Sequence, residues 1–275
     1  MTTPNPVLNK LGLSTNERVV IFHADDIGMC HASQAAYEDL AAADAISSAA
    51  VMVPCSWFPA TARFCRENQA ALPHLDMGVH LTLTCEWSQY RWGPVSTRDA
   101  SSGLLDDEGY FFRDCGPVQE KGVVTAVYRE LAAQYDRALA AGIEPTHIDS
   151  HMGCVFHPRL IQTYFQLAHE RQVPALMVRA HTLEAEYLPP HDLAVFQEIL
   201  TALEESGFPL LDHIDMMPLD QPGQRLETAK QRLDALPAGV SYFIIHPAKD
   251  TPELRAIAPD WACRAADYHL FMSDE

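Results

Sequence analysis

The chain has 275 residues, of which 48% are hydrophobic and 20% are charged, and its 37 acidic and 19 basic residues give a formal net charge of -18. This length and composition are typical of a folded protein with a sizeable core, and they exclude disordered, collagen-like and coiled-coil proteins. The strong negative charge disfavours partners with phosphate backbones and anionic membranes, so neither nucleic acid nor membrane is expected to bind. No stretch approaches the roughly 20 apolar residues that a membrane span needs.

Residues 1–17 are polar and lack the basic and apolar blocks of a secretory signal peptide. The seven cysteines are scattered, odd in number and without a Cys-x-x-Cys pair. Both features predict reduced thiols and a cytoplasmic protein.

Short apolar runs alternate with longer amphipathic stretches along the whole chain. Strands are predicted at 18–23, 46–53, 75–84, 146–150, 175–179, 210–214 and 240–245. Helices are predicted at 31–43, 57–68, 120–141, 158–172, 191–206 and 223–236. Alternating strands and helices form right-handed βαβ units with a parallel sheet. We therefore expect one α/β domain over residues 1–275, a TIM-like barrel of about seven parallel strands, with an open doubly wound sheet as the alternative.

One long irregular segment, residues 85–117, interrupts this alternation. It is rich in aromatic residues: Trp87, Tyr90, Trp92, Tyr110, Phe111 and Phe112. A loop of this length inside a compact domain is usually functional, and aromatics among polar residues suit a sugar-binding surface. The alternative interpretation, that the aromatics only attach the loop to the barrel, has equal weight.

Two adjacent carboxylates, Asp25 and Asp26, follow the first predicted strand. Carboxyl ends of parallel strands are where reactive groups collect. Two neighbouring buried carboxylates repel each other unless a cation or a shared proton lies between them. The alternative is a helix cap beside a surface acid.

Histidines lie in the third and fourth predicted strands. His80 alone would more often be a hydrogen-bonded core residue than a ligand. His147, Asp149 and His151 alternate, so they share one face of a straight strand. Polar side chains repeated on a buried face are costly unless they have a function.

A parallel fold would bring together Asp26, His80 and His151 from three separate strand ends. One carboxylate and two imidazoles form a common ligand set for a hydrolytic divalent metal with an open position. This arrangement leaves Asp25 beside the metal as a base, and places His246, which ends the last predicted strand, opposite it as an acid.

Four segments resemble motifs of the YdjC family, also called the ChbG/HpnK-like carbohydrate deacetylases. Residues 23–28 (His-Ala-Asp-Asp-Ile-Gly) are similar to its Ala-Asp-Asp-Phe-Gly motif, and 78–82 (Gly-Val-His-Leu-Thr) to its Gly-x-His region. Residues 146–151 (Thr-His-Ile-Asp-Ser-His) resemble its Thr-His-x-Asp-Ser-His motif, and 245–247 (Ile-His-Pro) its late His-Pro. All four come in the family's order.

The resemblance implies a deformed (β/α) barrel related to that of the polysaccharide deacetylases. It implies a divalent metal on Asp26, His80 and His151, and removal of an acetyl group from an N-acetylated sugar. Asp25 would be the base and His246 the acid. After residue 151 the chain reads Met-Gly-Cys-Val, where chitooligosaccharide deacetylases have further histidines. The resemblance therefore does not specify which N-acetylated sugar is the substrate.

Further residues are expected around the substrate. Arg179 matches a family arginine that orients a carboxylate or the substrate, and the same role in substrate binding is expected for Trp87, Trp92 and His147. Arg264 and Asp267 match a weaker family pattern without an assigned catalytic role. The resemblance also makes a homodimer an expectation.

The function expected from all these observations is metal-dependent hydrolysis of an N-acetylated sugar or oligosaccharide. Mg²⁺ and Zn²⁺ are the expected metals, and the ligand types also allow Mn²⁺ or Co²⁺. The alternatives are another barrel metallohydrolase acting on a phosphoester or a cyclic amide, and a non-catalytic sugar-binding relative. The pairing of Asp25 with His246 argues against the last, because binding needs neither a base nor an acid.

Overall fold

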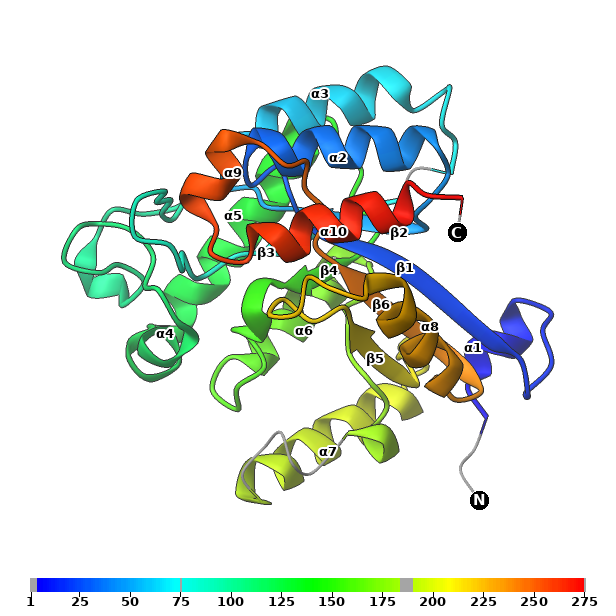
Figure 1. The fold of residues 1–275 in the computed structure, drawn as a ribbon. Helices are drawn as coiled ribbons and strands as arrows, with labels where there is room; N and C mark the ends of the chain where they lie inside the picture. The colour runs from blue at the N-terminus through cyan, green and yellow to red at the C-terminus, as the bar shows by residue number, and fades with distance from the viewer. Residues whose placement is uncertain (1–3, 75, 184–189, 275) are drawn as a thin grey trace.

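The computed structural model describes residues 4–74, 76–183 and 190–274. Its centre is a parallel sheet of six strands in the order β4-β3-β2-β1-β6-β5 (Figure 1). The strands are β1 (Arg18–Ile27), β2 (Ser48–Val51), β3 (Met77–Leu81), β4 (Ile148–Ser150), β5 (His213–Met216) and β6 (Gly239–Ile245). The α/β class and the parallel pairing predicted from the alternating pattern are therefore confirmed.

Helices connect and surround the strands (Figure 1). They are α1 (Pro6–Lys10), α2 (His31–Ala42), α3 (Phe58–Asn68), α4 (Cys115–Lys121), α5 (Val124–Ala140), α6 (Ile161–Arg171), α7 (Pro190–Glu205), α8 (Arg225–Ala235), α9 (Pro252–Ile257) and α10 (Trp261–Phe271). Within the described residues, short 3-10 turns lie at Ala100–Ser102, His151–Gly153 and Ala180–Thr182. The prediction of one helix over 120–141 is wrong at its start, because the chain leaves the helical conformation at Gly122 and begins α5 two residues later.

The sheet is curled into a half-barrel. His23 on β1 and Asp149 on β4 are separated by two intervening strands, yet His23 Nε2 lies 3.3 Å from Asp149 Oδ2. Neighbouring strands lie about 4.8 Å apart, so a flat sheet would hold these two strands roughly 14 Å from each other. The contact across the sheet therefore requires strong curvature, and the concave side carries polar groups.

A seventh strand at 175–179 is not formed, so the predicted seven-stranded barrel is only partly present. This segment makes single parallel bridges, Ala175 to Ile148 of β4 and Val178 to Leu211 just before β5. Each end thus pairs with a different neighbour at one position only, which is too little for a continuous ladder. The segment spans the gap between the two edges of the sheet without closing it as a strand.

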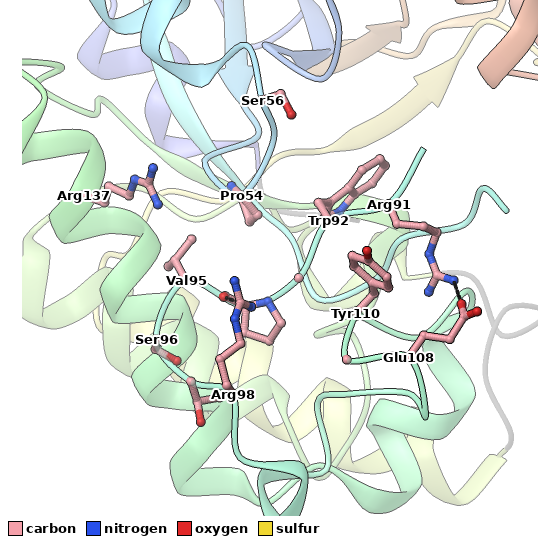
Figure 2. Close-up of a pocket in the computed structure, with 14 residues that line it drawn as sticks. Pro54, Ser56, Arg91, Trp92, Val95, Ser96, Arg98, Glu108, Tyr110 and Arg137 are labelled. Atoms are coloured by element: carbon pink, nitrogen blue, oxygen red, sulfur yellow. Dashed lines mark hydrogen bonds and ion pairs between the residues drawn. The ribbon is translucent and has the colours of Figure 1, made fainter. Parts of the chain in front are cut away.

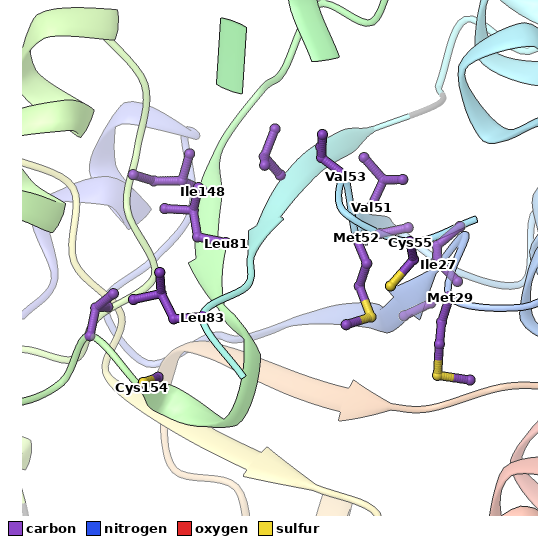
Figure 3. Packing of buried hydrophobic residues seen from close by; sticks show 14 of the residues in the cluster. Ile27, Met29, Val51, Met52, Val53, Cys55, Leu81, Leu83, Ile148 and Cys154 are labelled. Carbon is purple, nitrogen blue, oxygen red and sulfur yellow. The ribbon is translucent and has the colours of Figure 1, made fainter. Parts of the chain in front are cut away.

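The convex side of the sheet holds the hydrophobic core beneath the helices. Along β3, Val79 and Leu81 belong to the hydrophobic cluster, whereas His80 between them contacts Asp149. This alternation is the two-residue period of a strand. Figure 3 shows apolar side chains of this cluster, among them Val51 of β2, Leu81 of β3 and Ile148 of β4, along consecutive strands.

The C-terminal helix α10 is fixed to this convex side by aromatic contacts. The ring of Phe22 on β1 lies 6.0 Å from that of Phe243 on β6 and 5.6 Å from that of Phe271 on α10. This packing brings the face of α10 that carries Arg264 and Asp267 toward the carboxyl ends of β1 and β6.

Over the part of the chain that the structure describes, no helix combines the length and the apolar character needed to cross a membrane. All seven cysteines are free thiols, as the scattered spacing predicted.

Candidate active site

The structure brings Asp26, His80 and His151 together into a buried group, which we call the ligand cluster. Asp26 Oδ1 lies 3.0 Å from His151 Nδ1 and 3.4 Å from His80 Nε2, and the two nitrogens are 3.3 Å apart. Ligand atoms that share one ion at about 2.0–2.2 Å are separated from each other by roughly 3.0–3.5 Å. Asp26 Oδ1 has no hydrogen-bond partner among the described residues. The three atoms therefore fit a single divalent metal.

The backbone at the end of β1 explains how two successive residues reach the same site. Asp26 has a left-handed φ of 61°, and the register with β2 is irregular between Ala24 and Ile27. In a regular strand Asp25 and Asp26 would point to opposite faces. A bulge with a positive φ re-aims one side chain, at a conformational cost that active sites often carry.

Two carboxylates orient the histidines of the ligand cluster. Asp149 Oδ1 lies 2.8 Å from His80 Nδ1, and Glu86 Oε2 lies 3.0 Å from His151 Nε2. Each carboxylate accepts the N–H of the ring nitrogen that faces away from the cluster, so the other nitrogen presents a lone pair to a metal. The sequence pattern placed Asp149 on one strand face with His147 and His151, but nothing in the sequence pointed to Glu86, which lies in the long loop and has no motif around it.

Glu86→Gln is expected to weaken metal binding by about 10–100-fold, the usual effect of removing an orienting carboxylate. The amide keeps the size of the side chain but loses the charge that favours the N–H form of His151 Nε2. Competition with a chromophoric chelator at neutral pH measures the affinity. Glu108→Gln, an exposed position in the same loop, is the control, and equal affinities of the two variants would contradict the role of Glu86.

An arginine from α10 balances the charge of the cluster. Arg264 Nη1 lies 2.7 Å from Asp26 Oδ2, and both side chains are buried. Burial alone would raise the pKa of Asp26, but the guanidinium of Arg264, together with His151, holds it well below its usual range. The Asp26 carboxylate is therefore ionised and ready to bind a cation.

Protons and metal compete for His151. Burial alone would lower the pKa of His151, but Glu86 and Asp26 raise it to about 10. In the unfolded chain a histidine titrates near 6.5, so the protonated ring stabilises the metal-free fold fully below about pH 6.5 and loses this contribution as the pH rises toward the folded pKa. A bound metal takes the place of the proton.

The chelator-treated protein is accordingly expected to lose thermal stability between about pH 6.5 and 10 more steeply than the metal-loaded protein. Melting temperatures over this range measure the difference. His151→Gln, in chelator, isolates the contribution of this ring and should show a flatter profile than the chelated wild type. Parallel profiles for these two proteins would refute the assignment.

Asp25 and His246 lie beside the ligand cluster. Asp25 Oδ2 is 3.9 Å from His80 Nε2 and 3.7 Å from His246 Nε2, and Asp25 Oδ1 is 3.1 Å from His23 Nε2. The backbone N–H of His246 donates to Asp267 of α10. Burial lowers the pKa of His246, so its ring is neutral at rest. The five residues expected to bind metal or transfer protons thus lie in one site.

Arg179 and His147 lie outside this group. Arg179 pairs with Asp212 at 3.3 Å and with Glu204 at 3.2 Å, and Asp212 accepts the N–H of Val240 at the start of β6. Arg179 therefore joins the segment before α7 to the amino ends of β5 and β6. His147 Nδ1 contacts Thr146 Oγ1 at 2.9 Å, and the ring borders a cavity of about 270 Å³. Arg179 thus faces the amino ends of these strands, and His147 faces His23 and Asp149 rather than Asp26, His80 and His151.

The tryptophans of the long loop are mostly buried. Trp87 and Trp92 are 6% and 5% exposed, and their rings are 5.6 Å apart. The indole N–H of Trp92 donates to the carbonyl of Thr84, and the guanidinium of Arg264 lies 5.6 Å from the centre of the Trp87 ring. These contacts attach the loop to the site, which favours the structural interpretation of the two side chains.

A cavity of about 670 Å³ lies under the same loop. Figure 2 shows Trp92 and Tyr110 on one side of it and Arg98 and Arg137 on the other. Tyr110 is 38% exposed, so it is the aromatic ring of this cavity that a ligand can reach most easily. Glu108 pairs with Arg91 at the edge.

Comparisons with known proteins agree with this geometry. Residues 19–275 match the family model described as YdjC-like protein. The chain is 35% identical over 272 residues to a carbohydrate deacetylase of Thermus thermophilus, covering 98% of this chain and 91% of that protein. It is 27% identical to a chitooligosaccharide deacetylase of Yersinia enterocolitica, covering 58% of each. A crystal structure from Enterococcus faecalis, provisionally described as a cellobiose-phosphate cleavage protein, has the same fold, with a TM-score of 0.73, 24% identity and coverage of 94% and 92%. The chain belongs to the YdjC-like family.

Proposed function

We propose that the protein is a metal-dependent N-deacetylase, which hydrolyses the linear amide bond of an N-acetylated sugar or oligosaccharide. The observation that carries this proposal is geometric: Asp25, which could act as a base, lies 3.9 Å from His80 of a cluster that fits one metal, and 3.7 Å from His246, which could act as an acid. The names of the relatives, carbohydrate deacetylase and chitooligosaccharide deacetylase, support the same reaction.

Asp26, His80 and His151 would hold the metal. Two imidazoles and one carboxylate favour a transition metal such as Zn²⁺, Mn²⁺ or Co²⁺, whereas Mg²⁺ prefers oxygen ligands. When bound, the ion supplies Lewis acidity to the amide carbonyl and to the attacking water. The orienting bonds from Asp149 and Glu86 keep both imidazole lone pairs directed at it.

Asp25 and His246 then move one proton through the reaction. Asp25 Oδ2 accepts the proton of the water as its oxygen bonds to the acetyl carbon. His246 is neutral at rest, and its Nε2 lies 3.7 Å from Asp25 Oδ2. The same proton can therefore pass to His246 and onward to the amine nitrogen as the C–N bond breaks. Acetate and a free amino sugar are the products, and Asp25 returns to its ionised form.

The long loop would receive the sugar. Its exposed aromatic ring, Tyr110, and the 670 Å³ cavity next to Trp92 provide an apolar face among polar groups. Trp87 and Trp92 support this surface from within, and their burial leaves Tyr110 as the ring on which a sugar could stack.

A screen for acetate release over a panel of N-acetylated mono- and oligosaccharides, with Zn²⁺, Mg²⁺, Mn²⁺ or Co²⁺, tests the proposal. We expect at least one sugar to release acetate, with activity lost on chelation and in His80→Ala. His169→Ala, on the exposed face of α6, should keep full activity. Phosphoesters and cyclic amides belong in the same screen. Hydrolysis of one of these, without release of acetate from any sugar, would refute the proposal.

Homodimer formation and a cytoplasmic location, both expected from the sequence, stay predictions. Sedimentation at several protein concentrations tests the first, and a fluorescent fusion at the native expression level tests the second.

A further inference from the structure

A second group of histidine and aspartate side chains lies inside the half-barrel next to the ligand cluster. We call His23, His147 and Asp149 the inner cluster. Each residue offers one possible ligand atom, and these atoms lie within 4.8 Å of one another. The atoms that the other contacts leave available are His23 Nε2, His147 Nε2 and Asp149 Oδ2. All three are buried and have no hydrogen-bond partner among the described residues. We propose that the inner cluster is a second divalent cation site, of the kind that binds Zn²⁺.

The remaining polar atom of each residue is already engaged. His23 Nδ1 lies 3.0 Å from Ser48 Oγ, and His147 Nδ1 lies 2.9 Å from Thr146 Oγ1. When each Nδ1–H donates to its hydroxyl, each Nε2 presents a lone pair to the inner cluster. Asp149 Oδ1 accepts from His80, which leaves Oδ2 for the inner cluster. Metal-binding histidines commonly have such a partner on the second ring nitrogen.

The electrostatics of the inner cluster require a positive charge. Three buried acceptors that face one another are unfavourable unless a cation or a proton lies between them. His23 is fully buried and Asp149 is 1% exposed, so water does not screen them. Burial alone would lower the pKa of His23, but Asp149 and Asp25 raise it.

A proton on His23 could supply this positive charge instead of a metal. The two possibilities differ in whether His147 Nε2 gains a partner. Protonated His23 can donate to Asp149 at 3.3 Å or to Asp25 at 3.1 Å, but His147 Nε2 would still lack a donor. One cation satisfies all three atoms. The His147 ring also lies where a Cβ on residue 78 would come within 2.4 Å of its Nε2, so Gly78 leaves the space that this ring occupies.

Asp149 links the two clusters, because one of its oxygens faces His80 and the other faces the inner cluster. A cation at the inner cluster would hold the Asp149 carboxylate in the orientation that positions His80. The inner cluster thus supports the proposed reaction without contacting the sugar.

Metal content of the full chain tests the inference. After loading with Zn²⁺ alone and removal of the excess, mass spectrometry of the metal should give two ions per wild-type chain. His147→Ala and His147→Leu, the second of which fills the space of the ring, should each hold one. His151→Ala should also hold one, the double variant of 147 and 151 none, and His169→Ala two.

Anomalous scattering at the zinc edge locates each ion. A peak bounded by His23, His147 and Asp149 would establish the inner site. One ion in the folded wild type, or two ions in folded His147→Leu, would overturn the inference, and a melting curve of each variant verifies folding. The number of bound zinc ions does not test the proposed deacetylase activity. That activity is tested separately, by the release of acetate.

Discussion

Asp25→Asn is expected to lower kcat by about 10²–10⁴, the usual contribution of a positioned base, while the protein keeps its metal. The Asn amide has nearly the same shape, but its oxygen cannot take a proton from the attacking water. Asp25 does not belong to the ligand cluster, and its Oδ2 lies 3.9 Å from His80 Nε2. Steady-state kinetics of acetate release and metal content of the same sample measure the two quantities.

Asp107→Asn, an exposed position on the long loop, is the matched control and should leave kcat unchanged. Loss of metal from Asp25→Asn, with full recovery of the rate on adding metal, would make Asp25 a ligand. Asp149 could hardly replace it as the base, because both of its oxygens point to histidines.

Arg264→Met is expected to lower the free energy of unfolding of the chelated protein by about 3–5 kcal/mol, the usual cost of leaving a buried charge without its partner. Asp26 would then be a buried carboxylate without its guanidinium partner, although it would still contact His80 and His151. The long methionine side chain keeps the contact with Trp87, so the loss reports on charge more than on packing. Urea unfolding in the presence of chelator measures it.

A bound metal should reduce this loss, because the ion itself balances the charge of Asp26. Arg255→Met, which breaks the exposed pair with Asp250, should have little effect and serves as the control. A loss below about 1 kcal/mol in chelator, the size expected for a surface pair, would show that Arg264 does not balance Asp26.

The ligand cluster was predictable because its members end or follow separate strands. In a parallel sheet the carboxyl ends meet at one edge, so Asp26, His80 and His151 could be joined before their distances were known. The same rule placed His246 opposite Asp25. Local polarity and strand order were sufficient for these residues.

The supporting residues could not be found in this way. Glu86 reaches His151 from a loop whose path depends on the packing of Trp87 and Trp92, and such packing has no periodic signal in the sequence. Arg264 reaches Asp26 from a helix that was not predicted. Arg264 and Asp267 are three residues apart, a spacing that places both on one face of a helix. This spacing was the signal in the sequence that could have indicated the helix.

One cause explains both the absence of a seventh strand among the described residues and the position of Arg179. Residues 175–178 are apolar like a buried strand, but the curl of the sheet gives the segment one partner on each side at different positions. Curvature is a property of the whole sheet, and it moved Arg179 to the amino ends of β5 and β6. Counting apolar runs could not reveal this displacement.

The pairing of Asp26 with Arg264 joins residues 238 positions apart. During synthesis the first strand, with its two aspartates, leaves the ribosome long before the helix that balances one of them. The Asp26 carboxylate therefore lacks its guanidinium partner until α10 docks. Closure of this ion pair belongs to a late stage of folding, and contacts of such long range are expected to make that stage slow.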